Sequence, residues 1–145
     1  MTESDGGVLT ADEVNAYFHS GYPSAAESGI RCDDLGEGWA VARWEYDPSQ
    51  LRPGGYISGP TQFTLADTAI WFAVFTVIGI SPMAVTTDLS ISFLRPATGA
   101  DLLARADIDR VGRTRISARV LLWVDGNPDR PVSHVIGSYA RPQEE

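Results

Sequence analysis

The chain has 145 residues, 43% of them hydrophobic and 21% charged, which indicates one globular domain with a sizeable core rather than a disordered chain. The net charge is −8, and every basic residue is an arginine. Nucleic acids and anionic membrane surfaces are bound through extended basic faces. We therefore predict neither a nucleic-acid partner nor a membrane partner.

The single cysteine and the first residues give information on the subcellular location of the protein. Cys32 has no second cysteine with which to form an internal disulfide. Residues 1–7 are acidic and polar and lack the basic start and apolar run of a signal peptide. The most apolar stretch, residues 69–80, is too short to span a bilayer. These features predict a cytoplasmic protein with a flexible start over residues 1–9 and a single domain over residues 10–141.

The first predicted element is a helix. Thr10 and Glu13 have the spacing of a capping box, in which each side chain accepts a hydrogen bond from the backbone amide of the other. Apolar side chains then follow on one helical face. We expect this helix to run to about Ser20. Two strands are expected next, near residues 29–35 and 38–47, followed by a loop rich in proline and glycine over residues 47–58.

A second helix is predicted from Pro60 to about Ile78. Proline suits the first helical position, where its missing amide proton is not needed. The residues that follow are apolar on nearly every side of the helix, which is typical of a helix buried in a core. Gly79 and Pro82 end it.

Residues 85–94, 102–109 and 115–124 alternate with a period of two and predict three strands, and a fourth strand is expected over residues 132–140. Short connections favour antiparallel pairing of consecutive strands. The expected fold class is therefore α+β, with a long antiparallel sheet wrapped around one central helix and an extra N-terminal helix. Apolar helix faces left over by this arrangement suggest a partner subunit.

Several segments together resemble a known family. Residues 51–60 (Leu-Arg-Pro-Gly-Gly-Tyr-Ile-Ser-Gly-Pro), followed by Leu65-Ala66-Asp67, resemble the signature loop and central helix of hotdog-fold thioesterases of the phenylacetic-acid-degradation (PaaI-like) type. Residues 87–97 are similar to that family's next strand, and the resemblance covers about residues 30–140. It implies a hotdog fold, hydrolysis of acyl-coenzyme A without a metal or redox cofactor, and assembly as a homodimer or a dimer of dimers.

The resemblance also implies catalytic residues. The family's carboxylate corresponds to Asp67, as a general base for water or as a nucleophile, and its oxyanion-binding amide corresponds to Gly59. The family usually has His-Gly-Gly where this chain has Ser58-Gly59-Pro60, and asparagine or glutamine where it has Arg52. Ser58 is a candidate donor to the thioester carbonyl, and capping of the helix is the alternative role.

Asp67 also stands out without any family, because it is the only charged residue between Arg52 and Asp88. A helix acid that faces solvent or caps a neighbour is the alternative interpretation. Asp67 lies eight residues after Gly59, which is about 12 Å along a helix. One helix cannot bring both groups to one thioester, whereas two antiparallel helices across a dimer axis can. We therefore predict a site shared between subunits.

Contacts with the substrate are expected from Arg52, Gly55, Pro60, Thr68, Trp71, Arg95 and Arg113. Arginine side chains match phosphate groups in charge and geometry, although solvated arginines at strand ends are the alternative. Trp71 is a candidate for lining an acyl pocket, or simply for packing in the core. His19 and His134 have no acidic or cysteine neighbours at metal-ligand spacing, so no metal site is predicted.

Residues 125–128, Asp-Gly-Asn-Pro, resemble the start of a hydratase motif found on related hotdog proteins. That motif requires histidine where this chain has Arg130, so we interpret the segment as a turn. The leading hypothesis is an acyl-coenzyme A thioesterase. The alternative is a non-catalytic hotdog module that binds acyl-coenzyme A or a protein partner.

Overall fold

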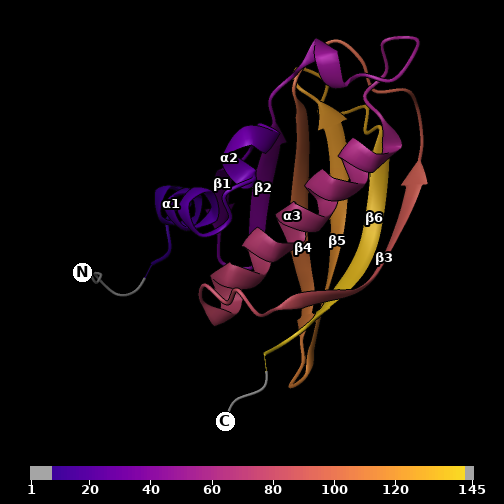
Figure 1. The fold of residues 1–145 in the computed structure, drawn as a ribbon. Coiled ribbons are helices and arrows are strands. Elements are labelled where there is room, and N and C mark those ends of the chain that lie inside the picture. Colours follow the sequence, from indigo (N-terminus) through magenta and orange to yellow (C-terminus); the bar gives the residue numbers. More distant parts are fainter. Residues whose placement is uncertain (1–7, 143–145) are drawn as a thin grey trace.

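The strands of the computed structural model, which describes residues 8–142, are β1 (Ile30–Gly36), β2 (Trp39–Trp44), β3 (Val85–Phe93), β4 (Leu102–Val111), β5 (Arg115–Val124) and β6 (Ser133–Ala140). They form one sheet in the order β1-β2-β4-β5-β6-β3, with every neighbouring pair antiparallel (Figure 1). All six predicted strands are confirmed. The predicted flexible start falls mainly on residues 1–7, which lie outside the described residues.

Helix α3 (Gly59–Ile78) lies across one face of this sheet (Figure 1). By length and composition alone it would be able to cross a membrane, and half of its apolar window is buried inside the fold. Small residues on the strands beneath it are fully buried and leave room for the helix: Ala40, Ala42, Ala104 and Ala106. A sheet wrapped around a central helix is the predicted hotdog fold, which is thereby confirmed.

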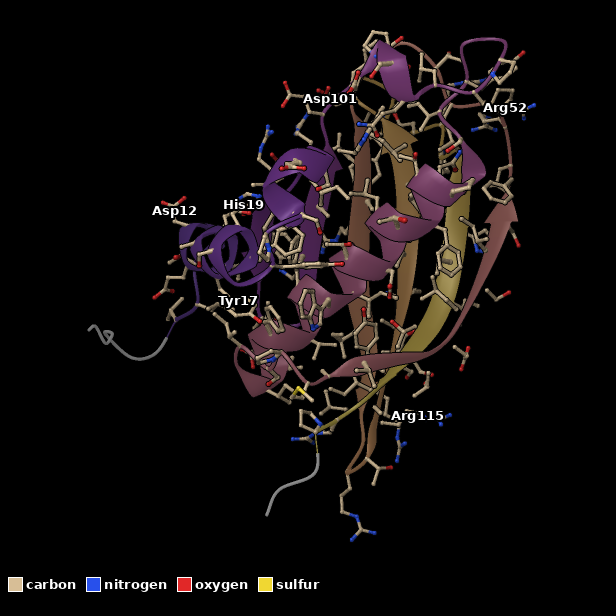
Figure 2. All side chains as sticks on the ribbon, viewed as in Figure 1. Asp12, Tyr17, His19, Arg52, Asp101 and Arg115 are labelled. Carbon is tan, nitrogen blue, oxygen red and sulfur yellow. The ribbon has the colours of Figure 1, made fainter. Side chains whose placement is uncertain are left out.

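Two further helices precede the sheet, α1 (Ala11–Gly21) and the short α2 (Ala25–Ser28). The predicted capping box starts α1, since Thr10 and Glu13 each accept a hydrogen bond from the backbone amide of the other. Tyr17 of α1 (Figure 2) and its neighbour Phe18 pack edge-on against aromatic rings of α3. The ring centres of Phe18 and Phe72 are 5.1 Å apart. One side of α3 is thus covered by the chain itself.

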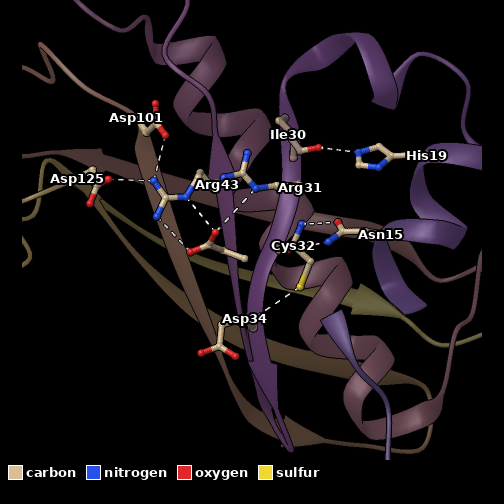
Figure 3. A network of polar contacts seen from close by, with 10 residues as sticks. Asn15, His19, Ile30, Arg31, Cys32, Asp34, Arg43, Asp101 and Asp125 are labelled. Atoms are coloured by element: carbon tan, nitrogen blue, oxygen red, sulfur yellow. Dashed lines mark hydrogen bonds and ion pairs between the residues drawn. The ribbon is translucent and has the colours of Figure 1, made fainter. Parts of the chain in front are cut away.

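Hydrogen bonds also join α1 to β1 (Figure 3). The Asn15 side chain donates to the Cys32 carbonyl at 2.8 Å and accepts from the Cys32 amide at 2.7 Å. A His19 ring nitrogen lies 3.0 Å from the Ile30 carbonyl. Cys32 itself is buried, and this burial raises the pKa of its thiol to about 12.

Arg43 on β2 forms ion pairs with carboxylates from neighbouring strands and strand ends (Figure 3). Its guanidinium donates to Asp33 through Nε at 3.0 Å and Nη2 at 3.2 Å, and the third nitrogen, Nη1, lies 3.0 Å from both Asp101 and Asp125. Hydrogen bonding to Asp33 is the main reason why the pKa of Arg43 is raised above its ordinary value. One charged group therefore joins β1, β2 and the ends of β4 and β5.

Candidate active site

A tight turn precedes the central helix. The Arg52 amide donates to the Tyr56 carbonyl at 3.0 Å, and the Gly55 amide donates to the Arg52 carbonyl at 3.1 Å. Gly54 and Gly55 both have positive φ, +95° and +79°, a conformation that favours glycine. The turn places the Arg52 guanidinium 5.9 Å from the centre of the Tyr56 ring. Two side chains that can meet a ligand therefore stand together just before α3.

Ser58 and Gly59 form the start of α3. The Ser58 hydroxyl accepts from the Thr61 amide at 3.2 Å and donates its proton to the Thr61 hydroxyl at 3.0 Å. This geometry assigns Ser58 to capping, the second of the two roles considered from the sequence. A side chain on Gly59 would begin 3.2 Å from the Phe93 ring. Within residues 8–142, no group accepts a hydrogen bond from the Gly59 amide.

A cleft of about 480 Å³ opens at this helix start. Three predicted site residues line it, namely Arg52, Gly59 and Arg95. The sequence interpretation missed Tyr56, Ile57, Gln62, Phe93, Leu94, Pro96 and Ala97. Gln62 offered a signal, because it is a long polar residue within a largely apolar helix. The cleft thus combines a helix-start amide with apolar walls and two arginines.

Asp67 lies two helical turns further along α3 and is held by two hydroxyl groups. Thr86 of β3 donates to Oδ1 of Asp67 at 2.7 Å, and Tyr139 of β6 also reaches Oδ1 at 2.7 Å. The Tyr139 hydroxyl lies 3.0 Å from the Asp67 backbone carbonyl as well. Among the described residues, no hydrogen bond reaches Oδ2. Both donors fix one carboxylate oxygen and leave the other available.

Tyr139 is suited to remain a donor. Its side chain is 4% exposed, and burial, followed by the negative charge of Asp67, raises the pKa of its hydroxyl well above the ordinary value. The phenol is therefore protonated at any pH at which the protein would work. Neither Tyr139 nor Thr86 was among the predicted site residues.

Within one chain, Asp67 and the Gly59 amide face different ends of the same edge strand. Gly59 neighbours Phe93 at the end of β3, whereas Asp67 contacts Thr86 near its beginning. Eight residues of helix separate them by about 12 Å. A single subunit therefore does not bring the carboxylate and the amide onto one thioester bond.

Some predicted substrate-binding residues lie away from the cleft on or near α3. Gly55 is exposed in the turn before the helix. Pro60 borders a small pocket beside Ile30 and Trp44. The Thr68 hydroxyl donates to the Thr64 carbonyl of its own helix. None of these groups lines the cleft within the described chain.

Two others also lie elsewhere. Trp71 packs against the aromatic rings of α1, with its ring centre 6.2 Å from that of Phe18, so its surroundings are those of a core residue. Arg113 belongs to the β4–β5 turn, next to Arg115, which lies at the opposite end of the molecule from Arg52 (Figure 2). Within residues 8–142, no three His, Cys, Asp or Glu side chains are grouped to hold a metal ion.

Known proteins are similar to this chain in sequence and in fold. The sequence profile of the thioesterase superfamily matches residues 54–129, more than half of the chain. A protein of Halobacterium salinarum named as an esterase is 35% identical over 91 residues, which are 59% of this chain and 60% of that protein. The match thus spans less than two thirds of that relative.

Solved structures are similar to this chain as well. A protein of Silicibacter sp. TM1040, described as a thioesterase, is 33% identical with a TM-score of 0.84, over 94% of each chain. The E. coli PaaI protein from the phenylacetic acid degradation operon is 24% identical with a TM-score of 0.75, over 90% of this chain and 92% of that one. The latter similarity concerns the fold alone. The family resemblance of the sequence is confirmed, and the chain belongs to the thioesterase superfamily, a family of thioester hydrolases with the hotdog fold.

Proposed function

We propose that the protein hydrolyses acyl-coenzyme A thioesters, with Asp67 as general base and the Gly59 amide as oxyanion donor. The observation that carries the proposal is the setting of Asp67. Thr86 and Tyr139 both donate to Oδ1 at 2.7 Å, so the carboxylate is oriented and Oδ2 is left to accept a proton. A positioned base of this kind typically accelerates a reaction about 10²-fold to 10⁴-fold.

The site is completed by a second copy of the chain. Gly59, Phe63 and Asp67 are spaced by four residues and lie on one face of α3. Phe63, midway between the two functional groups, is 40% exposed. A two-fold axis near Phe63 would set Gly59 of one subunit against Asp67 of the other. The edge strand β3, with Val85 and Phe93 exposed at its two ends, runs alongside this face.

The proposed reaction needs no group beyond water and these residues. The water oxygen attacks the thioester carbonyl carbon while its proton passes to Oδ2 of Asp67. The carbonyl oxygen gains negative charge, which the Gly59 amide and the dipole of the helix start stabilise. The intermediate collapses as the C–S bond breaks, and Asp67 returns the proton to the departing thiolate. The products are a carboxylic acid and the free thiol.

Arginines around the cleft support coenzyme A as the thiol. A second pocket of about 410 Å³ shares Tyr56 and Arg95 with the cleft and adds Arg130. Within residues 8–142, Arg52, Arg95 and Arg130 lie outside salt-bridge distance of any carboxylate. Guanidinium groups without an acidic partner are available to phosphate. In a protein of net charge −8, such a local group favours an anionic substrate at this position.

The test is release of free thiol from a panel of acyl-coenzyme A substrates by the wild type and by Asp67→Asn. We expect the variant to lose at least about 100-fold in kcat while its Tm stays within a few degrees. Asp12→Asn, on the exposed first turn of α1 (Figure 2), is the matched control and keeps full activity.

Full activity of Asp67→Asn would exclude Asp67 as the base. Tight binding of acyl-coenzyme A by the wild type, with no thiol released from any substrate, would instead favour the non-catalytic binding module. Turnover in heavy-oxygen water separates base from nucleophile, because only a nucleophile would carry the label in the Asp67 carboxylate.

A further inference from the structure

Gln62 is an unusual residue for the interior of this protein. It lies on the first turn of α3, is 4% exposed, and is one of three buried polar residues in the described chain. Its side-chain nitrogen donates to the Ile57 carbonyl at 3.3 Å. Its side-chain oxygen, Oε1, is buried and has no hydrogen-bond partner among the described residues. Buried acceptors of native proteins are nearly always paired, so an unpaired one calls for an explanation.

The assignment of the two amide atoms follows from the neighbouring carbonyl. Ile57 offers an acceptor, which only the amide nitrogen of Gln62 can satisfy. Ile57 is itself held in place, because its amide donates to the Ala97 carbonyl at 2.9 Å. The 3.3 Å contact to Ile57 is long for such a bond, and the terminal torsion of glutamine has a broad minimum. Oε1 can therefore turn toward a partner without rebuilding the helix.

Gln62 is an available side-chain hydrogen-bond acceptor in the cleft beside the start of α3. Gln62 lines it together with Gly59, three residues earlier and about 4.5 Å along the helix axis. Among the side chains that line this cleft, only Tyr56 and Gln62 carry an oxygen, since Arg52 and Arg95 have only donors and the others are apolar. Among these lining side chains, only that of Gln62 has a buried carbonyl oxygen without a hydrogen-bond partner in residues 8–142.

We infer that Gln62 is a catalytic residue whose Oε1 accepts a hydrogen bond from the water that attacks the thioester. This role rests on the proposed function. A water molecule has two protons, and Asp67 of the second subunit takes only one. A second acceptor at Gln62 fixes the water, so that an oxygen lone pair points at the carbonyl carbon held by the Gly59 amide. No proton passes to Gln62, and its amide is unchanged by the reaction.

The inference predicts that activity falls without a matching loss of stability. Gln62→Met keeps the length of the side chain but removes both the acceptor and the amide nitrogen. The variant no longer buries an unpaired oxygen, but it also gives up the long 3.3 Å hydrogen bond to the Ile57 carbonyl, so the two effects on Tm oppose each other and Tm should stay within a few degrees of the wild-type value. Loss of a hydrogen bond to the reacting water should lower kcat about 10-fold to 100-fold with KM within about twofold. A structural role would lower Tm and leave kcat alone.

The experiment measures kcat, KM and Tm for the wild type, Gln62→Met and Gln50→Met. Gln50 is exposed in the short 3-10 helix η2 (Pro48–Gln50) that precedes α3, and its side-chain nitrogen donates to Asp47. Its variant therefore controls for the substitution itself and keeps wild-type kinetics. Gln62→Leu, which also removes the acceptor, provides a second variant if methionine does not fit.

A lower kcat with Tm within a few degrees of the wild-type value supports the inference. It is overturned by an unchanged kcat, by a rise in KM alone (which would mean that Gln62 contacts the substrate rather than the water), or by activity that falls only together with Tm in both variants. A wild type that hydrolyses no thioester refutes the proposed function instead, and this is established before the variants are compared.

Discussion

The contact between Tyr139 and Asp67 offers a sharp test of how the carboxylate is held. Tyr139→Phe removes one hydroxyl and leaves a buried ring of nearly the same shape. The lost bond runs from a phenol to a carboxylate oxygen at 2.7 Å. Hydrogen bonds to charged groups contribute about 1.5–3 kcal/mol. Asp67 is only partly buried, and water can take over some of this contact, so we expect a loss of about 1–2 kcal/mol.

For a domain of this length, that loss corresponds to a Tm lower by about 2–8 °C. The activity should fall further than the stability suggests, by about 10-fold in kcat, because Thr86 alone then orients the carboxylate. Tm by calorimetry and kcat by thiol release measure the two effects. Tyr22→Phe is the control, since Tyr22 is 50% exposed, and it should change neither. If Tyr139→Phe retains wild-type kcat, the hydroxyl does not position the base.

The same contact predicts a dependence on alkaline pH. The ordinary pKa of tyrosine is near 10, and burial with the Asp67 charge raises the folded value for Tyr139. Above about pH 10 the unfolded chain releases this proton while the folded protein keeps it, so the folded state binds more protons and its stability falls as pH rises. The stability difference between the wild type and Tyr139→Phe should therefore be largest at neutral pH and should shrink above about pH 10. A difference that grows there would contradict the assignment.

Two further predictions concern the cleft and the cysteine. Gly59→Ala places a methyl group 3.2 Å from the Phe93 ring and obstructs approach to the oxyanion amide, so kcat/KM should fall about 100-fold without a lower Tm; an unaffected kcat/KM would show that the substrate does not approach the backbone at this position. Because burial raises the pKa of Cys32 to about 12, the native thiol should resist a thiol reagent at pH 8 and react only in denaturant, and fast labelling of the folded protein would show that the residue is accessible.

The elements of this fold could be predicted because each one has a local signal. Alternation marked β3 to β5, the Thr10–Glu13 spacing marked the start of α1, and a largely apolar run marked α3. Helix α2 was missed, since four residues carry no period to detect. Asp67 stood out because it is the only charge in a long apolar segment.

The surroundings of the site could not be predicted in the same way. Tyr139 reaches Asp67 across 72 positions of sequence, and only the pairing of β6 with β3 brings it there. Phe93 and Gly59 meet for a similar reason, because β3 returns past the start of α3. Thr68 is adjacent to Asp67 in sequence, but a helix directs adjacent side chains to different faces, and Trp71, one turn later, packs against the rings of α1 instead. Closeness in sequence was therefore a poor guide to which residues share the cleft.

The position of Arg43 has a consequence for how the protein would unfold over time. Its three carboxylate partners lie 10, 58 and 82 positions away in the chain. The two distant contacts can form only after β4 and β5 have docked beside β2, and closing such long loops is slow and costs entropy. We expect them to be largely absent from the folding transition state. An interaction that forms after the folding transition state leaves the folding rate unchanged and slows unfolding. The Arg43 contacts would therefore lengthen the lifetime of the native state.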